Sequence, residues 1–113
     1  MKNRLAIVAN SGYVLKVADW IALVEKHPSL VVVTGRTARN PATLEIVKLR
    51  DRPDLVDVIL DQSKIGRMQW EQEYYPAITF DAVEGHETDM IEMLEELAEA
   101  MNAVVGEYPD DRA

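Results

Sequence analysis

Short runs of apolar, β-branched residues alternate with segments of helical periodicity, and this alternation restricts the fold more than any other feature. The runs have the length and composition of strands buried on both faces, and they lie at 5–9, 30–34, 56–60, 77–80 and 103–105. Strands separated by helices favour right-handed crossover connections. We therefore expect an α/β fold, a three-layer sandwich around a five-stranded, mainly parallel sheet.

Four segments between these runs have apolar residues at three- and four-residue spacing, which is typical of amphipathic helices. The predicted helices cover residues 14–26, 41 to about 51, 63–72 and 88–101. Asn40 and Pro41 form a helix-start signal for the second, because asparagine caps well and proline fits the first turn. Gly66 disfavours the third.

The length and composition indicate one domain. With 113 residues, 48% of them hydrophobic, we expect a single domain over 1–108 and a tail over 109–113. Cysteine is absent and there are two histidines, so we expect no disulfide and no metal. We also expect no cofactor, as the family resemblance described below implies. No apolar run approaches the roughly 18 residues of a membrane span, and no signal peptide is recognisable. We therefore expect a cytoplasmic protein that does not bind membranes.

The formal net charge is −8, which argues against nucleic-acid binding because phosphate contacts need clustered lysine and arginine. The charge is unevenly distributed. Residues 84–111 contain no lysine or arginine, whereas most basic residues lie in 16–67. We therefore expect an anion site in the first two thirds of the chain. An acidic mimic of nucleic acid is an alternative that rests on net charge alone.

The segment after the second predicted strand has the residues of a phosphate-binding loop. Thr34, Gly35, Arg36 and Thr37 combine two hydroxyls, a guanidinium and a glycine that lets backbone N–H groups approach a ligand. This pattern predicts that the loop holds a phosphate group. An ordinary polar turn with an exposed arginine explains the same residues equally well.

Ligands of parallel sheets bind outside the carboxyl ends of the strands, so the loops there are the candidate site. Asn10 follows the first predicted strand, and Asp61 follows the third. His86 and Asp89 follow the fourth and begin a helix, where the cationic form of histidine is disfavoured. Taken alone, a structural or solvated role explains His86 and Asp89 better than catalysis does.

Several stretches together resemble the methylglyoxal synthase-like superfamily, which includes methylglyoxal synthase and the regulatory domain of carbamoyl phosphate synthetase. The matching stretches are 5–10, Trp20, 34–37, 85–90 and 102–105. The resemblance implies an oligomeric α/β sandwich with a five-stranded parallel sheet. It also implies that Thr34 and Thr37 contact a phosphate, and that His86 and Asp89 line the reacting end of the pocket.

The sequence departs from the synthase at positions that matter for catalysis. Val14 stands where the synthase has a phosphate-binding lysine, and Arg36 replaces a threonine. The stretch that carries the catalytic aspartate is shortened to 60–64, where Asp61 is the available carboxylate. These departures favour a binding domain over an enzyme.

We therefore expect a small-molecule binding domain that recognises a phosphorylated ligand, a nucleotide or a sugar or triose phosphate, for sensing, regulation or sequestration. The alternative is a lyase that eliminates phosphate from dihydroxyacetone phosphate, with Asp61 or Asp89 as base and His86 as the polarising group. A third interpretation is a structural, partner-binding domain. The apolar surplus at Trp70, Tyr74 and Tyr75 further predicts a homo-oligomer.

Overall fold

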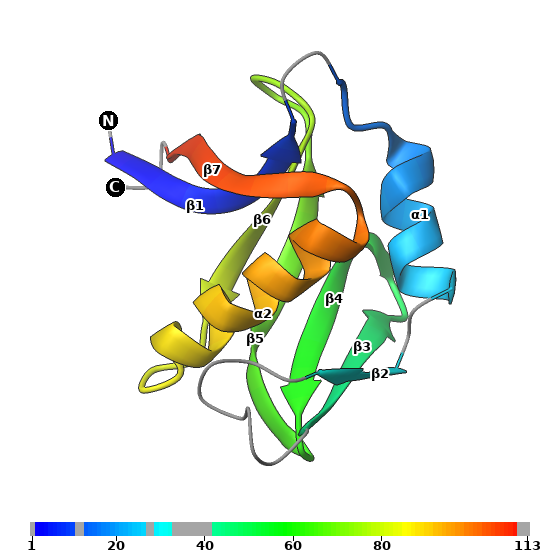
Figure 1. Ribbon diagram of the computed structural model, residues 1–113, viewed down its shortest axis with the longest axis vertical. Helices are drawn as coiled ribbons and strands as arrows, with labels where there is room; N and C mark the ends of the chain where they lie inside the picture. Colours follow the sequence, from blue (N-terminus) through cyan, green and yellow to red (C-terminus); the bar gives the residue numbers. More distant parts are fainter. Residues whose placement is uncertain (1, 11–12, 27–28, 33–41, 111–113) are drawn as a thin grey trace.

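The computed structural model describes residues 2–10, 13–26, 29–32 and 42–110. Within these residues the chain forms seven strands and two helices (Figure 1). In chain order they are β1 (Lys2–Ala9), α1 (Val17–Lys26), β2 (Ser29–Val32), β3 (Ala42–Leu49), β4 (Arg52–Leu60), β5 (Ser63–Glu71), β6 (Ala77–Ala82), α2 (Glu87–Ala100) and β7 (Ala103–Asp110).

The described strands form one sheet in the order β2-β3-β4-β5-β6-β1-β7, and every neighbouring pair is antiparallel. The predicted α/β sandwich around a mainly parallel sheet is therefore wrong. The physical reason lies in the connections from β3 to β6. Tight turns at 50–51 and 61–62 join β3 to β4 and β4 to β5, and such short links allow only antiparallel neighbours.

The segment predicted as a second helix is strand β3. Its side chains alternate between buried and exposed, with Ala42, Leu44 and Ile46 inside and Thr43 and Glu45 outside. This period of two is that of a strand with one solvated face. The strand is held on both sides, by β2 and by β4. Partners distant in sequence therefore override the helix-start signal before it.

The segment predicted as a third helix is strand β5. Gly66 lies beneath the start of α2, where a Cβ atom would be 2.5 Å from the Asp81 carbonyl oxygen and 2.8 Å from Met90 Sδ. The glycine therefore allows the helix and the neighbouring strand to approach closely. Met68 and Trp70 continue the buried side of the strand.

The first and last predicted helices are confirmed as α1 and α2. The predicted strand runs 5–9, 56–60, 77–80 and 103–105 lie within β1, β4, β6 and β7, and the part of 30–34 that the structure describes lies in β2. Strand β7 extends through Pro109 and Asp110, so the first two residues of the predicted tail, 109–113, belong to the sheet.

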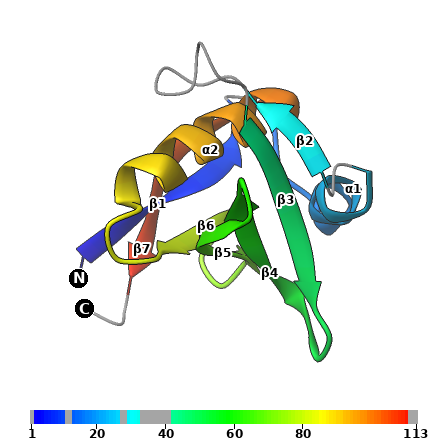
Figure 2. The same ribbon diagram turned by 90° about the horizontal axis from the view of Figure 1, so that it is seen from below.

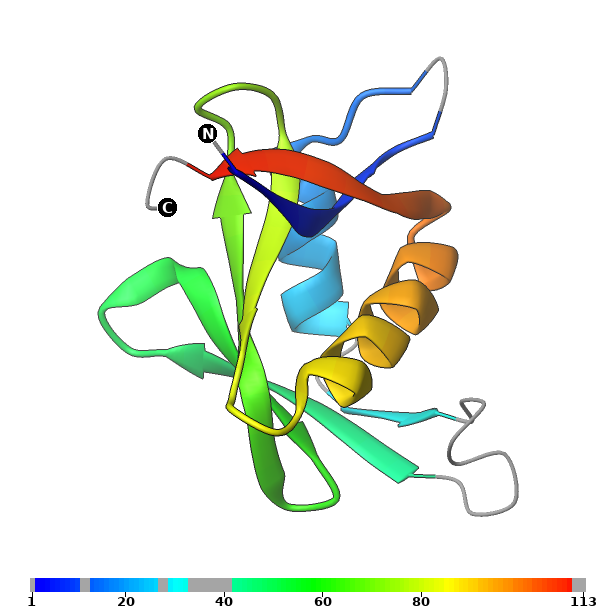
Figure 3. The ribbon, with the colours of Figure 1, turned by 90° about the vertical axis from the view of Figure 1, so that its left-hand side faces the viewer.

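Both helices cover the same face of the sheet, so the molecule has two layers rather than three (Figures 2 and 3). Trp20 and Leu23 of α1 share one hydrophobic core with Met93 and Leu97 of α2 and with the inner side chains of the strands. Neither described helix is both long and apolar enough to cross a membrane.

The outer face of the sheet has no helix over it among the described elements, and several of its charged residues form ion pairs. Arg4 lies 3.5 Å from Asp81, and Arg67 lies 2.8 Å from Asp57. Much of the positive charge of the sheet is thus neutralised on this face.

Candidate functional site

The predicted phosphate loop, residues 34–37, lies outside the described residues. The strand directions nevertheless decide which of the other predicted site residues can meet. Strands β2, β4 and β6 run in the same direction, because each is two antiparallel steps from the next. Their carboxyl ends lie at the same end of the sheet, which brings Asp61 and His86 to that end. Strand β1 runs in the opposite direction, so Asn10 lies at the opposite end of the sheet.

Asp61 stabilises the turn between β4 and β5. Its Oδ1 accepts a hydrogen bond from the Thr43 backbone N–H at 2.9 Å, and its own N–H donates to the Thr43 carbonyl at 2.9 Å. Asp61 and Gln62 both have positive φ, 48° and 70°, which is the backbone of a tight hairpin turn. The carboxylate thus has a structural role in this turn, and it also lines a hollow of about 300 Å³ together with Thr43, Glu45 and Gln62.

His86 and Asp89 form a pair at the start of α2. His86 Nδ1 lies 2.9 Å from Asp89 Oδ2, and the side chains are 38% and 9% exposed. The His86 backbone N–H donates to the Val83 carbonyl, and its carbonyl accepts from Met90 N–H. The pair therefore links the N-cap position of α2 to its first turn, and the His86 side chain stays partly accessible.

Asn10 lies at the end of the sheet opposite to His86, where it links the end of β1 to the start of β7. Its Nδ2 donates to the Asn102 carbonyl at 2.9 Å. Asn102 itself has a φ of 57°, the left-handed conformation that commonly follows a helix end. This hydrogen bond ties the end of β1 to the connection between α2 and β7.

A hollow of about 360 Å³ lies at the end of β1, and we call it the tyrosine groove. It is lined by Val8, Ala9, Tyr13, Val14, Leu15, Tyr75, Pro76 and Glu107. Three of these residues are large, apolar and exposed: Tyr13 by 59%, Val14 by 62% and Tyr75 by 40%. The lining comes from four separate segments of the chain. The groove therefore exists only in the folded protein.

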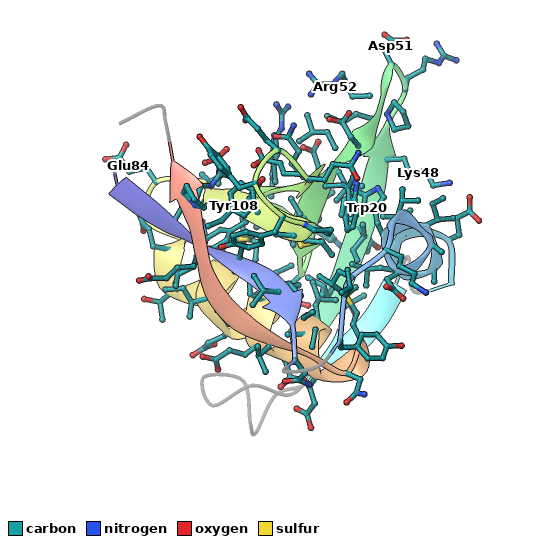
Figure 4. All side chains as sticks on the ribbon, turned by 90° about the horizontal axis from the view of Figure 1, so that it is seen from above. Trp20, Lys48, Asp51, Arg52, Glu84 and Tyr108 are labelled. Carbon is teal, nitrogen blue, oxygen red and sulfur yellow. The ribbon has the colours of Figure 1, made fainter. Side chains whose placement is uncertain are left out.

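Aromatic contacts hold the wall of the groove in place. The rings of Tyr75 and Tyr108 are 4.9 Å apart at 67°, and those of Tyr74 and Tyr108 are 5.7 Å apart at 71°, both edge-to-face arrangements. The Tyr108 hydroxyl accepts a hydrogen bond from the Tyr74 backbone N–H at 3.1 Å. Figure 4 shows Tyr108 beside the connection between β5 and β6.

The hydroxyl of Tyr75 donates a hydrogen bond to the Glu107 carbonyl. Partial burial, together with the neighbouring Tyr108 and Glu107, raises the pKa of Tyr75. The hydroxyl therefore stays protonated and remains a donor at neutral pH, which fixes the ring across the end of the groove.

Part of this surface is predicted by the sequence. Tyr74 and Tyr75 were identified as an apolar surplus, and both are exposed. Trp70, identified with them, is buried in the inner core. Val14 belongs to the helix predicted over 14–26, which actually begins at Val17, and Tyr13 belongs to the loop predicted before it.

Among the described residues no group of three or more histidine, aspartate or glutamate side chains is placed to hold a metal ion. Comparison of the chain with protein-family models, curated proteins and solved structures finds no match.

Proposed function

We propose that this chain is a protein-binding domain, and that the tyrosine groove receives an apolar side chain of a basic partner. The observation that carries this proposal is the exposure of Tyr13, Val14 and Tyr75 around one hollow. Exposed apolar residues are normal when scattered singly, but a contiguous patch of them marks an interaction site. Tyrosine is also enriched in protein interfaces, where its ring is buried and its hydroxyl stays hydrogen-bonded.

The chemistry of the lining supports an apolar anchor. Seven of the eight lining residues have aliphatic or aromatic side chains, and Glu107 is the charged one. Few polar groups converge on the hollow, so it is poorly suited to a polar metabolite, which needs several precisely placed partners. A partner side chain that is branched or aromatic, with a cation beside it, matches this lining.

The charge of the chain favours a basic partner over a second copy. The net charge is −8, and the stretch 84–111, which includes Glu107, has no lysine or arginine. Two copies joined through this surface would bring like charges together, which disfavours association. A cationic partner would instead be attracted and steered to it.

Selection of random displayed peptides on the full chain tests the proposal. We expect enriched peptides to combine a large apolar residue with lysine or arginine. Their affinity should fall about tenfold on Val14→Ser and remain unchanged on Val47→Ser, the matched control on the outer side of β3. Removing a buried apolar anchor contact by this change is worth about 1–2 kcal/mol, which corresponds to that factor.

Three results would contradict the proposal: no enrichment, enrichment of acidic peptides, or equal binding to Val14→Ser and the unmodified chain. Sedimentation of the same variants tests whether a second copy of the chain fills the groove instead. Should the chain dimerise, and should Val14→Ser abolish the dimer, the groove would be filled by a second copy, as the predicted homo-oligomer requires.

Binding of a phosphorylated small molecule is the second candidate function. The carboxyl ends of β2, β4 and β6 lie at the same end of the sheet, which favours this function. The predicted phosphate loop follows β2 in the sequence, and the partly exposed His86 follows β6. Titration with inorganic phosphate, followed by ³¹P and histidine NMR signals, tests it. We expect His86 signals to shift on the unmodified chain and not on Arg36→Ala. Release of methylglyoxal from dihydroxyacetone phosphate would instead indicate the lyase.

A further inference from the structure

Strand β7 is the last strand of the sheet, and one of its two sides has no strand beside it within the described part of the chain. It pairs with β1 along its whole length, from Ala103 opposite Ala9 to Asp110 opposite Lys2. An eight-residue edge is long compared with the four residues of β2 at the other edge. Edge strands of this length present rows of backbone groups that can pair with another chain.

Pro109 shows which backbone groups point outward. Residues of an antiparallel pair alternate between positions that exchange hydrogen bonds and positions that do not. Pro109 has no N–H, so its pair with Asn3 belongs to the second kind. By alternation, Val105 and Ala103 also direct their N–H and C=O groups away from β1. The hydrogen bond from the Tyr75 hydroxyl to the Glu107 carbonyl agrees with this assignment.

A hollow of about 280 Å³ runs beside this outward-facing edge, and we call it the β7–α2 hollow. One wall is the first part of β7, Ala103 to Val105. The other is a stripe of α2 and the residues after it, at three- and four-residue spacing: Glu95, Ala98, Glu99 and Asn102. An extended peptide can add as a strand to an exposed sheet edge, and a hollow beside the edge can receive one of its side chains.

The charge of the hollow specifies the peptide. Glu95 and Glu99 are both exposed and belong to the same helical stripe. Neither forms an ion pair with another residue in the described ranges, whereas Arg4, Arg52, Lys64 and Arg67 on the sheet are all paired with carboxylates. An arginine or lysine entering the hollow would therefore meet two unneutralised carboxylates one helical turn apart.

We propose that an extended segment of a basic partner adds as a strand to the outer edge of β7, with a lysine or arginine side chain between Glu95 and Glu99. Backbone hydrogen bonds to Val105 and Ala103 supply affinity, and the two glutamates supply specificity for the cation. A second copy of this chain does not fit the same edge, because its own α2 glutamates would face these. The proposal does not depend on the tyrosine groove, which other residues line.

NMR titration of the full ¹⁵N-labelled chain tests the proposal directly. The probe is an eight-residue peptide of alternating valine and threonine with one central lysine. We expect the amide signals of Ala103 to Val105 to shift and to show contacts with the peptide backbone. The same peptide with glutamate in place of lysine, and the same peptide with alternate backbone nitrogens methylated, should each bind at least tenfold more weakly.

Variants of α2 provide the matched control. The double substitution Glu95→Gln with Glu99→Gln should weaken the lysine peptide at least tenfold, and added salt should weaken binding to the unmodified chain. Glu92→Gln with Glu96→Gln removes the same charge from the same helix outside the hollow and should have little effect.

The proposal is overturned by the absence of binding at millimolar peptide, by shifts confined to other strands, or by equal losses in the two double variants. A chain with Val14→Ser should bind the lysine peptide normally. The proposal for the tyrosine groove is therefore tested by Val14→Ser, and the proposal for the β7 edge is tested separately by Glu95→Gln with Glu99→Gln.

Discussion

Replacing Gly66 by alanine tests how closely α2 approaches the sheet. The added Cβ would lie 2.5 Å from the Asp81 carbonyl oxygen and 2.8 Å from Met90 Sδ, both well inside ordinary van der Waals contact. The Asp81 oxygen belongs to the backbone of β6 and cannot rotate away. Overpacking of this kind costs about 1–3 kcal/mol. Because the backbone is involved, we expect the upper part of the range, about 2–3 kcal/mol of unfolding free energy.

Gly106 provides a matched control with a different kind of neighbour. A Cβ there would lie 2.7 Å from Val8 Cγ2, which is a side-chain methyl group. Shortening Val8 to alanine removes that clash, so the Gly106→Ala and Val8→Ala changes should couple favourably in a double-mutant cycle. Met90→Ala should rescue Gly66→Ala much less, because the carbonyl clash persists.

Urea unfolding followed by circular dichroism measures these free energies. The unfolding entropy of a chain of this length is about 0.24 kcal/mol/K, so Gly66→Ala should also lower Tm by about 8–12 °C. A loss below about 0.5 kcal/mol, or complete rescue by Met90→Ala, would refute the close approach of α2 and the strand assignment of this segment.

Three further predictions concern single side chains. Gln62 has a φ of 70°, so Gln62→Gly should raise the unfolding free energy by about 0.5–1 kcal/mol in urea titrations. The hydrogen bond from Arg52 lowers the pKa of Asp54. The pair therefore stabilises the fold above the usual aspartate pKa, and this stabilisation is lost as the pH falls through the lowered value. Arg52→Gln should raise the Asp54 pKa in a carboxylate NMR titration. Trp20 is buried and its Nε1 donates to the Pro53 carbonyl, so Trp20→Phe should cost about 1.5–3 kcal/mol by thermal unfolding.

The two helices could be predicted from sequence because their signals are local. Helix α2 has an apolar stripe at helical spacing, which includes Met93 and Leu97 and faces the core. It ends before Asn102, a residue type that tolerates the left-handed conformation found there. The short β-branched runs at 5–9 and 56–60 were likewise recognisable as strands, since their composition suits a buried pleated surface.

Part of the candidate surface was also visible in the sequence. The acidic character of 84–111 can be read from the residue types alone. It is the reason why a basic partner is expected at both the tyrosine groove and the β7–α2 hollow. Tyr74 and Tyr75 were recognised because three large aromatic residues lie close together in the chain. Val14 and the outer edge of β7 carried no comparable local signal.

The pairing and direction of the strands were decided by the tertiary structure alone. In β3, Leu44 and Ile46 share a strand face, but Val47 and Leu49 interrupt the alternation, so local periodicity could not exclude a helix. Hydrogen bonds to β2 and β4 make the segment a strand, and those partners are set by the whole sheet. The tyrosine groove follows from the same cause, whereas the β7–α2 hollow is lined by residues 95–105, which are neighbours in the sequence. The groove is assembled by long-range pairing of β1 with β7 and of β1 with β6, which no local sequence pattern encodes.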